Sequence, residues 1–257
     1  MNTQIAQTES LTSQLELSVN EQGQGRPVLV LHGGGGPLSV AGFAEAMSRN
    51  ARVFTPIHPG FNGTIRPDWL DSVDKLADTY LEWIAENELR DVLVVGFSMG
   101  GWIAASMAAQ DASRLRGVVL VNAVGIAVEG EPIADVFGMS PQEIRALSFH
   151  DPDKFRIEPT PQQIAITAAN FKTLAVYGKE MRDSNLASRL AGVTTPALVA
   201  WGESDRIATP AYGRAFAAAF GNGRFAPIAE SGHMPQIEQP ARLLALVEKF
   251  DAAIAQK

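Results

Sequence analysis

Short apolar runs recur along the chain and alternate with segments in which apolar residues repeat every three or four positions. The runs stand at 28–31, 53–54, 92–95, 118–121 and 197–201, with a weaker one at 224–228. Each is bounded by glycine, proline or charged residues, as expected of buried strands. Between them, 73–84 and 243–250 have the spacing of amphipathic helices. This alternation predicts an α/β fold: a mainly parallel sheet with helices on both faces.

The N-terminal part predicts a hairpin over residues 13–32. Leu15, Leu17 and Val19 alternate with polar residues, and the turn NEQGQGR then leads into an entirely apolar run at 28–31. Alternation followed by a solid apolar run indicates an edge strand paired with a central strand.

The alternation of strands and helices breaks once, between residues 123 and 195. This stretch holds helix-like pieces separated by prolines and no convincing strand. Prolines of this kind punctuate helices and loops. We therefore expect a core domain formed by 1–123 and 195–257, with an all-helical cap, or lid, inserted at 124–194.

Composition narrows the range of functions. The chain has 257 residues, 46% of them hydrophobic, which is enough for a sizeable core. Its formal net charge of -7 argues against nucleic acid as a partner. The absence of cysteine excludes disulfides, thiolate metal sites and a cysteine nucleophile. No segment approaches the roughly 20 apolar residues of a membrane span, and the N-terminus has no secretory signal pattern, so we expect a cytoplasmic location without membrane association.

The stretch GFSMGG places one serine between glycines at the end of a predicted strand. Gly96-x-Ser98-x-Gly100 follows the run 92–95 and precedes a predicted helix at 102–110. This is the setting in which a sharp turn lifts a serine hydroxyl above the sheet edge. The flanking glycines give neighbouring elements room, and Gly101 lets the helix approach the sheet. A purely structural turn gains nothing from the serine, so we predict that Ser98 is a nucleophile.

A serine hydroxyl needs a base to take its proton, and the chain has four histidines. His32 stands at a strand end, His58 in a proline-rich loop and His150 in the insertion. His233 lies in a loop between the last weak strand and the C-terminal helix. That position places it at the same carboxyl edge of the sheet as Ser98, and we predict that it is the general base.

The base in turn needs an acceptor that fixes its tautomer and stabilises the imidazolium. Asp205 follows the strand at 197–201 and emerges at the same edge. Glu203, two residues earlier, is the competing carboxylate, and Asn122 could orient the ring without carrying charge. We predict Asp205 as the acid.

Acyl transfer also needs donors for the developing oxyanion. We predict the amide of Met99, directly after the nucleophile, and that of Gly34 in the loop HGGGGP, with Gly35 as the alternative. The four glycines do not form a dinucleotide cradle, because both registers put a non-glycine residue, Leu38 or Ser39, where the third glycine is required. The histidines are too dispersed for a zinc helix, so we expect neither a metal nor an organic cofactor.

Five ordered motifs, HGGGGP, HPGFNGT, GFSMGG, WGESD and SGHMPQIEQP, resemble those of the α/β-hydrolase superfamily, specifically its capped members. The resemblance covers nearly the whole chain. It implies an eight-stranded, mostly parallel sheet with a helical cap over the site. It also implies Ser98 as nucleophile, Asp205 as acid, His233 as base, and Met99 with Gly34 as oxyanion amides.

The leading hypothesis is a serine hydrolase that cleaves a small, mainly apolar carboxylic ester or lactone through an acyl-enzyme. The alternatives are a carbon–carbon bond hydrolase of the meta-cleavage-product type, a cofactor-free haloperoxidase or perhydrolase, and a catalytically slow small-molecule-binding protein. The HGGGGP loop is similar to that of meta-cleavage-product hydrolases, which typically carry tryptophan after the histidine, whereas this chain has Met234. Serine at position 98 argues against a haloalkane dehalogenase. The sequence predicts no oligomeric state.

Overall fold

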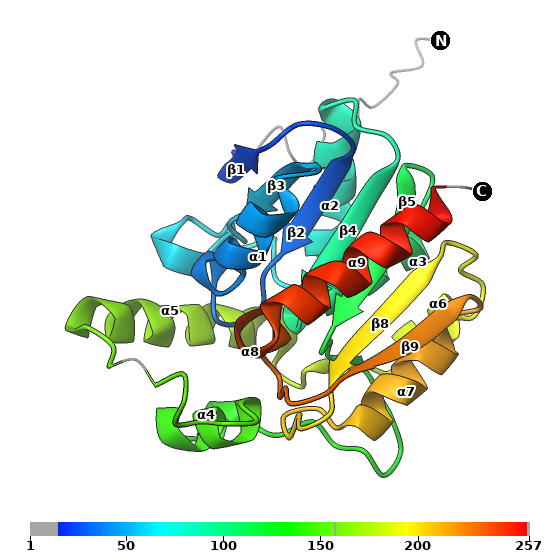
Figure 1. Cartoon of the computed structure of the whole chain (residues 1–257). Helices are drawn as coiled ribbons and strands as arrows, with labels where there is room; N and C mark the ends of the chain where they lie inside the picture. Colours follow the sequence, from blue (N-terminus) through cyan, green and yellow to red (C-terminus); the bar gives the residue numbers. More distant parts are fainter. Residues whose placement is uncertain (1–14, 157, 256–257) are drawn as a thin grey trace, which may run out of the picture.

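A seven-stranded sheet forms the centre of the molecule (Figure 1). The computed structural model describes residues 15–156 and 158–255. The strand order is β1-β3-β2-β4-β5-β8-β9, and every neighbouring pair is parallel except β1 with β3. The strands are β1 (Val19–Gln22), β2 (Pro27–Leu31), β3 (Arg52–Pro56), β4 (Val92–Phe97), β5 (Leu115–Val121), β8 (Ala197–Gly202) and β9 (Gly223–Ile228). The α/β class and the strand runs predicted from the sequence are confirmed.

The N-terminal hairpin expected over residues 13–32 is wrong. β3 lies between β1 and β2, since β1 pairs antiparallel with β3 and both edges of β2 are occupied by β3 and β4. Residues 13 and 14 lie outside the described residues. Within the described part of the chain the main sheet has seven strands where the resemblance implied eight, and residues 15–18 form no strand.

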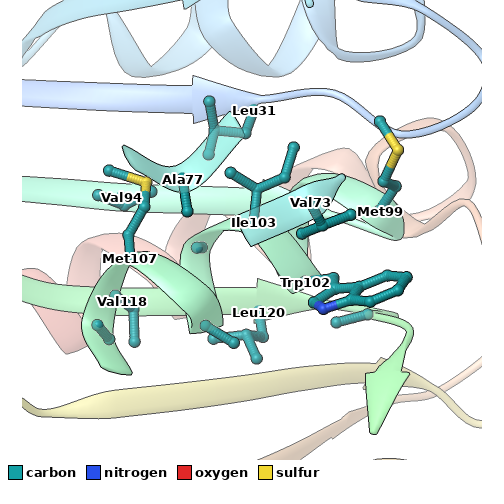
Figure 2. Packing of buried hydrophobic residues seen from close by; sticks show 14 of the residues in the cluster. Leu31, Val73, Ala77, Val94, Met99, Trp102, Ile103, Met107, Val118 and Leu120 are labelled. Carbon is teal, nitrogen blue, oxygen red and sulfur yellow. The ribbon is translucent and has the colours of Figure 1, made fainter. Parts of the chain in front are cut away.

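Two layers of helices bury the faces of this sheet. β4, β5 and β8 are buried along their whole length, and apart from Arg116 in β5 their sequences lack polar residues. One face packs against α2 (Val73–Glu86), α3 (Met99–Gln110) and α7 (Pro210–Ala219), and the other against α1 (Ala41–Met47) and α9 (Pro240–Ile254). Figure 2 shows Ile103 and Met107 of α3 lying over Val94 and Val118 of the sheet. None of the described helices is long and apolar enough to cross a membrane.

The segment between β5 and β8 contributes no strand to the main sheet. It contains a 3-10 turn, η4 (Val136–Gly138), and the helices α4 (Pro141–Ser148), α5 (Pro161–Gly178) and α6 (Leu186–Leu190). The expectation that it is all-helical is wrong in one respect. β6 (Gly125–Ile126) and β7 (Arg182–Asp183) pair in a small parallel sheet. Strands of two residues are too short to show a periodic pattern.

Side-chain caps explain where α4 and α5 begin. Ser140 and Thr160 each form a capping box with the residue three positions later, and a proline follows each of them at the first helical position. α6 differs from these two helices because it packs into the core: Leu186 and Leu190 are fully buried, and the helix contacts α3 and α7.

Candidate active site

Ser98 stands in the turn between β4 and α3 with backbone angles of φ 52° and ψ −116°. A positive φ is strained for a residue with a side chain and persists only where its surroundings enforce it. Here the Ser98 N–H donates to the Val121 carbonyl at 3.0 Å, and the Ser98 carbonyl accepts from the N–H groups of Gly101 and Trp102 at 3.0 and 3.2 Å. The turn is therefore held from both the sheet and the helix.

The glycines around Ser98 are required by close approach, as the sequence indicated. A Cβ on Gly96 would lie 2.1 Å from the Gly100 oxygen, and one on Gly100 would lie 2.2 Å from the Leu31 oxygen. A Cβ on Gly101 would lie 2.5 Å from that of Ala123, which follows β5. No side chain fits at these three positions without movement of the backbone.

Asp205 and His233 meet in a buried hydrogen bond. His233 Nδ1 donates to Asp205 Oδ2 at 2.8 Å, and their side chains are 9% and 0% exposed. Asp205 Oδ1 accepts from the N–H groups of Ile207 at 2.8 Å and Ala208 at 3.2 Å. Because a carboxylate only accepts, the ring proton lies on Nδ1, and Nε2 is left to act as an acceptor.

Neither competitor for the role of acid takes the place of Asp205. The side chain of Glu203 is exposed. Asn122 is buried and binds Asp205: its Nδ2 donates to Asp205 Oδ2 at 2.7 Å, and its Oδ1 accepts from the Gly202 N–H at 3.2 Å. Asn122 therefore orients the carboxylate and not the imidazole ring.

Parallel strands bring the predicted residues to one edge of the sheet. Ser98 follows β4, Asp205 follows β8 and His233 follows β9. Among the described residues, no hydrogen bond joins the Ser98 hydroxyl to His233. Ser98 is thus placed by its turn, and Asp205 and His233 are placed by their mutual bond.

The glycine loop lies against both Ser98 and the inserted segment. A Cβ on Gly33 would lie 2.9 Å from Ser98 Cβ, and one on Gly34 would lie 2.9 Å from Leu174 Cδ2 of α5. Neither the Gly34 N–H nor the Met99 N–H has a backbone or side-chain acceptor in the described residues. Both amides can therefore donate to a ligand.

Sequence reasoning weighed His32 and His58 only as alternative bases, and their structural role was missed. His32 Nδ1 donates to the Gly33 carbonyl at 2.8 Å, and its Nε2 accepts from the His58 N–H at 3.1 Å. His58 Nε2 donates to the His32 carbonyl at 2.8 Å, and its Nδ1 accepts from the Tyr80 hydroxyl at 2.5 Å. Burial lowers the pKa of His58 to about 4 and the pKa of His32 well below its usual range. Both rings are neutral near pH 7 and fix the start of the glycine loop.

Helix α5 is fastened to the loop that follows His58. Asn170 and Asn62 exchange two hydrogen bonds, of 2.8 and 3.1 Å. Thr173 and Tyr177 donate to carbonyl groups of the same loop at 2.9 and 2.8 Å. These three α5 residues lie on one face of the helix. The inserted segment therefore packs together with the glycine loop and the loop after His58.

Two pockets, of about 510 and 660 Å³, border the inserted segment. They share Ala127, Lys179, Glu180 and Arg182. The larger is also lined by Trp102 and Tyr177. Neither is lined by Ser98, Asp205 or His233, so neither by itself defines an acyl-binding site.

This fold and the order of its site-bearing turns are those of a known class of proteins. Residues 28–246 match the model of the Alpha/beta hydrolase family, and the chain belongs to that family.

The relatives include hydrolases with different substrates. The chain is 27% identical over 257 residues to the AB hydrolase superfamily protein YisY of Bacillus subtilis (strain 168), covering 91% of this chain and 94% of the relative. It is 24% identical to a 2-hydroxymuconate semialdehyde hydrolase of Pseudomonas putida over 94% of this chain and 92% of that protein. The meta-cleavage product hydrolase from Pseudomonas fluorescens IP01 has a TM-score of 0.75, with 20% identity over 91% of this chain and 93% of its own. The thermophilic esterase from Thermogutta terrifontis has a TM-score of 0.75, with 22% identity over 93% of both chains.

Proposed function

We propose that this hydrolase-family protein is a serine hydrolase that cleaves a small, mainly apolar carboxylic ester or lactone through an acyl-enzyme on Ser98. The observation that carries the proposal is the 2.8 Å bond between His233 Nδ1 and the fully buried Asp205 carboxylate, at the same sheet edge as the strained Ser98 turn. A histidine with only a structural role on a surface loop has no need of a buried carboxylate.

In the proposed cycle, Ser98 Oγ attacks the acyl carbon while His233 Nε2 takes its proton. Asp205 stays ionised and stabilises the imidazolium. The tetrahedral intermediate collapses as His233 gives the proton to the leaving alcohol. Water, activated by the same imidazole, then releases the acid and restores the serine. In a lactone the leaving alcohol stays attached to the acyl group through both steps, and the product is a single hydroxy acid.

The amides of Met99 and Gly34 are the proposed donors to the oxyanion. Met99 is the first residue of α3, where the N–H has no partner within the helix and the helix dipole favours negative charge. Gly34 supplies the second N–H from the loop whose Gly33 lies against Ser98. Preorganised donors of this kind stabilise charge only as it develops.

We propose that residues 124–194 cap this site and that 1–123 with 195–257 form the core. The contacts of α5 with the loop that follows His58 support this division. A cap over the serine would limit access of water and restrict the size of the acyl group.

A carbon–carbon bond hydrolase is the second candidate. The 2-hydroxymuconate semialdehyde hydrolases among the relatives favour it, and the same three side chains serve its chemistry. Met234, which stands where such enzymes typically carry tryptophan, disfavours it.

The test is hydrolysis of p-nitrophenyl acetate, butyrate and octanoate by the wild-type protein beside Ser98→Ala and His233→Ala. We expect wild-type turnover, and a loss in kcat on the order of a thousandfold or more in each folded variant. Thermal unfolding of each variant is the control. Turnover that survives Ser98→Ala would overturn the mechanism. The second candidate is established if the wild-type protein hydrolyses none of the three esters, still reacts with a phosphonate at Ser98, and cleaves 2-hydroxymuconate semialdehyde.

A further inference from the structure

Glu238, five residues after His233, carries a buried carboxylate that the proposed cycle does not use. It ends the short helix α8 (Pro235–Glu238) and is 8% exposed. Its Oε2 accepts from the Gly232 N–H at 2.6 Å, and its Oε1 accepts from the N–H groups of His150 at 2.9 Å and Asp151 at 3.2 Å. The His150 N–H also lies 3.2 Å from Oε2. A buried carboxylate is costly unless donors compensate it, and here backbone amides do so from two sides.

The two sides belong to segments far apart in the sequence. Gly232 precedes the proposed base, whereas His150 and Asp151 follow α4 in the inserted segment. One carboxylate therefore joins the loop of His233 to the proposed cap.

Further contacts hold the same junction together. The His233 N–H donates to the Ser148 carbonyl at 2.6 Å, and the Arg206 N–H donates to the Leu147 carbonyl at 3.2 Å. His150 Nδ1 and Ser204 Oγ lie 2.7 Å apart. The chain at 147–151 thus binds both the loop of the acid and the loop of the base.

The junction tolerates little displacement. A Cβ on Gly232 would lie 2.3 Å from the Ser148 oxygen, so the two backbones are in direct contact. A shift of the carboxylate or of the 148–151 segment would move Gly232, and His233 with it.

We propose that Glu238 is a positioning residue. It fixes the position of His233 through Gly232, and it makes that position depend on how residues 148–151 of the proposed cap pack against the loop. The proposal rests on the proposed function, because it takes His233 as the base.

The decisive variant is Glu238→Gln, which preserves shape but sets an NH2 group against backbone donors on one side. We expect kcat to fall about 10- to 100-fold, with a smaller change in KM, because small misplacement of a catalytic group has effects of this size.

Two further variants separate the effect of the Glu238 charge from the effect of its side-chain length. Glu238→Asp keeps the charge but is one methylene shorter, so it should also lower kcat. Glu230→Gln is the matched control, since Glu230 is an exposed glutamate before the same loop, and we expect it to behave as wild type.

Two measurements do not need turnover: the NMR chemical shifts of the His233 imidazole, and amide hydrogen exchange at Gly232, His150 and Asp151. Glu238→Gln should change the His233 chemical shifts and speed exchange at these amides. If wild type turns over no ester but these changes occur, the positioning role stands and the proposed function fails. If Glu238→Gln matches Glu230→Gln in kcat, chemical shifts and exchange, the positioning role is overturned. Should Glu238→Gln not fold, the same comparison with Glu238→Asp decides through kcat and exchange.

Discussion

Asp205 is the most tightly held side chain at the site. Two backbone N–H groups bind its Oδ1, while Asn122 and His233 bind its Oδ2. With both oxygens engaged, the carboxylate cannot rotate without losing hydrogen bonds in a region closed to water. This fixes the tautomer of His233, which is what a general base at this position requires.

Replacement of this acid is a sharp test of the assignment. We expect Asp205→Asn to lower kcat about 10⁴-fold with p-nitrophenyl butyrate, because the amide can present NH2 to Nδ1 and favour the wrong tautomer. Glu203→Gln should leave kcat unchanged, since that side chain is exposed. Steady-state kinetics on both variants, with thermal unfolding as the check on folding, measures the effect. The reverse pattern would reassign the acid to Glu203.

At the scale of single residues, the sequence was sufficient to predict those residues whose role depends on the local geometry of the chain. Glycines on both sides of a serine after a buried strand indicated the turn at Ser98, and the close contacts of Gly96 and Gly100 explain why. The bonds of Glu238 to His150 and of Asn122 to Asp205 could not be predicted, because these partners lie 88 and 83 residues away in the chain.

At the scale of helices and strands, the packing of α3 against the sheet depends on Gly101. A Cβ there would meet both Ala123 Cβ at 2.5 Å and the Gly96 oxygen at 3.1 Å, and neither belongs to a flexible side chain. The distance of α3 from the sheet is therefore set by the absence of a side chain at Gly101, and α3 begins with Met99, the proposed oxyanion donor.

We expect Gly101→Ala to lower the free energy of unfolding by about 1–3 kcal/mol relative to Gly42→Ala, the cost typical of overpacking. Gly42 lies in α1 with no atom within 4 Å of an added Cβ, so Gly42→Ala reports the gain in helix propensity alone. Urea unfolding measures both variants. Adding Ala123→Gly to Gly101→Ala should recover part of the loss, and equal stability of the two single variants would contradict the clash.

The order of the strands shows what a linear pattern cannot specify. The runs at 28–31 and 53–54 correctly predicted strands, but the placing of β3 between β1 and β2 depends on pairing across the sheet. Likewise α6 lies within the insertion predicted from the sequence, yet its fully buried leucines pack with α3 and α7.

At the scale of the whole molecule, one buried polar network ties the core to the inserted segment. Tyr80 of α2 binds His58, His58 binds His32, and His32 binds the glycine loop. The loop after His58 carries α5 through Asn62. Helix α2, the glycine loop and α5 therefore depend on two imidazoles that fit their partners only when neutral.

This dependence gives the molecule an acid-sensitive stability. The pKa of His58 is about 4 in the folded state and that of His32 is well below its usual range, whereas an unfolded histidine titrates near 6.5. Below pH 6.5 the unfolded chain thus binds more protons than the folded one. The stabilisation is complete above about pH 6.5 and is lost as pH falls toward 4, by up to about 1.4 kcal/mol per pH unit for each histidine.

Urea unfolding between pH 7 and 5 should show this decline, and NMR titration should place the midpoint of His58 near pH 4. The range stops at pH 5 because carboxylates titrate below it. The exposed His150 is the matched control, and His150→Gln should keep the wild-type slope. An unfolding free energy that stays level from pH 6.5 to 5 would mean that the pair accepts protons in the folded state. The glycine loop would then have to be held by contacts other than these two rings.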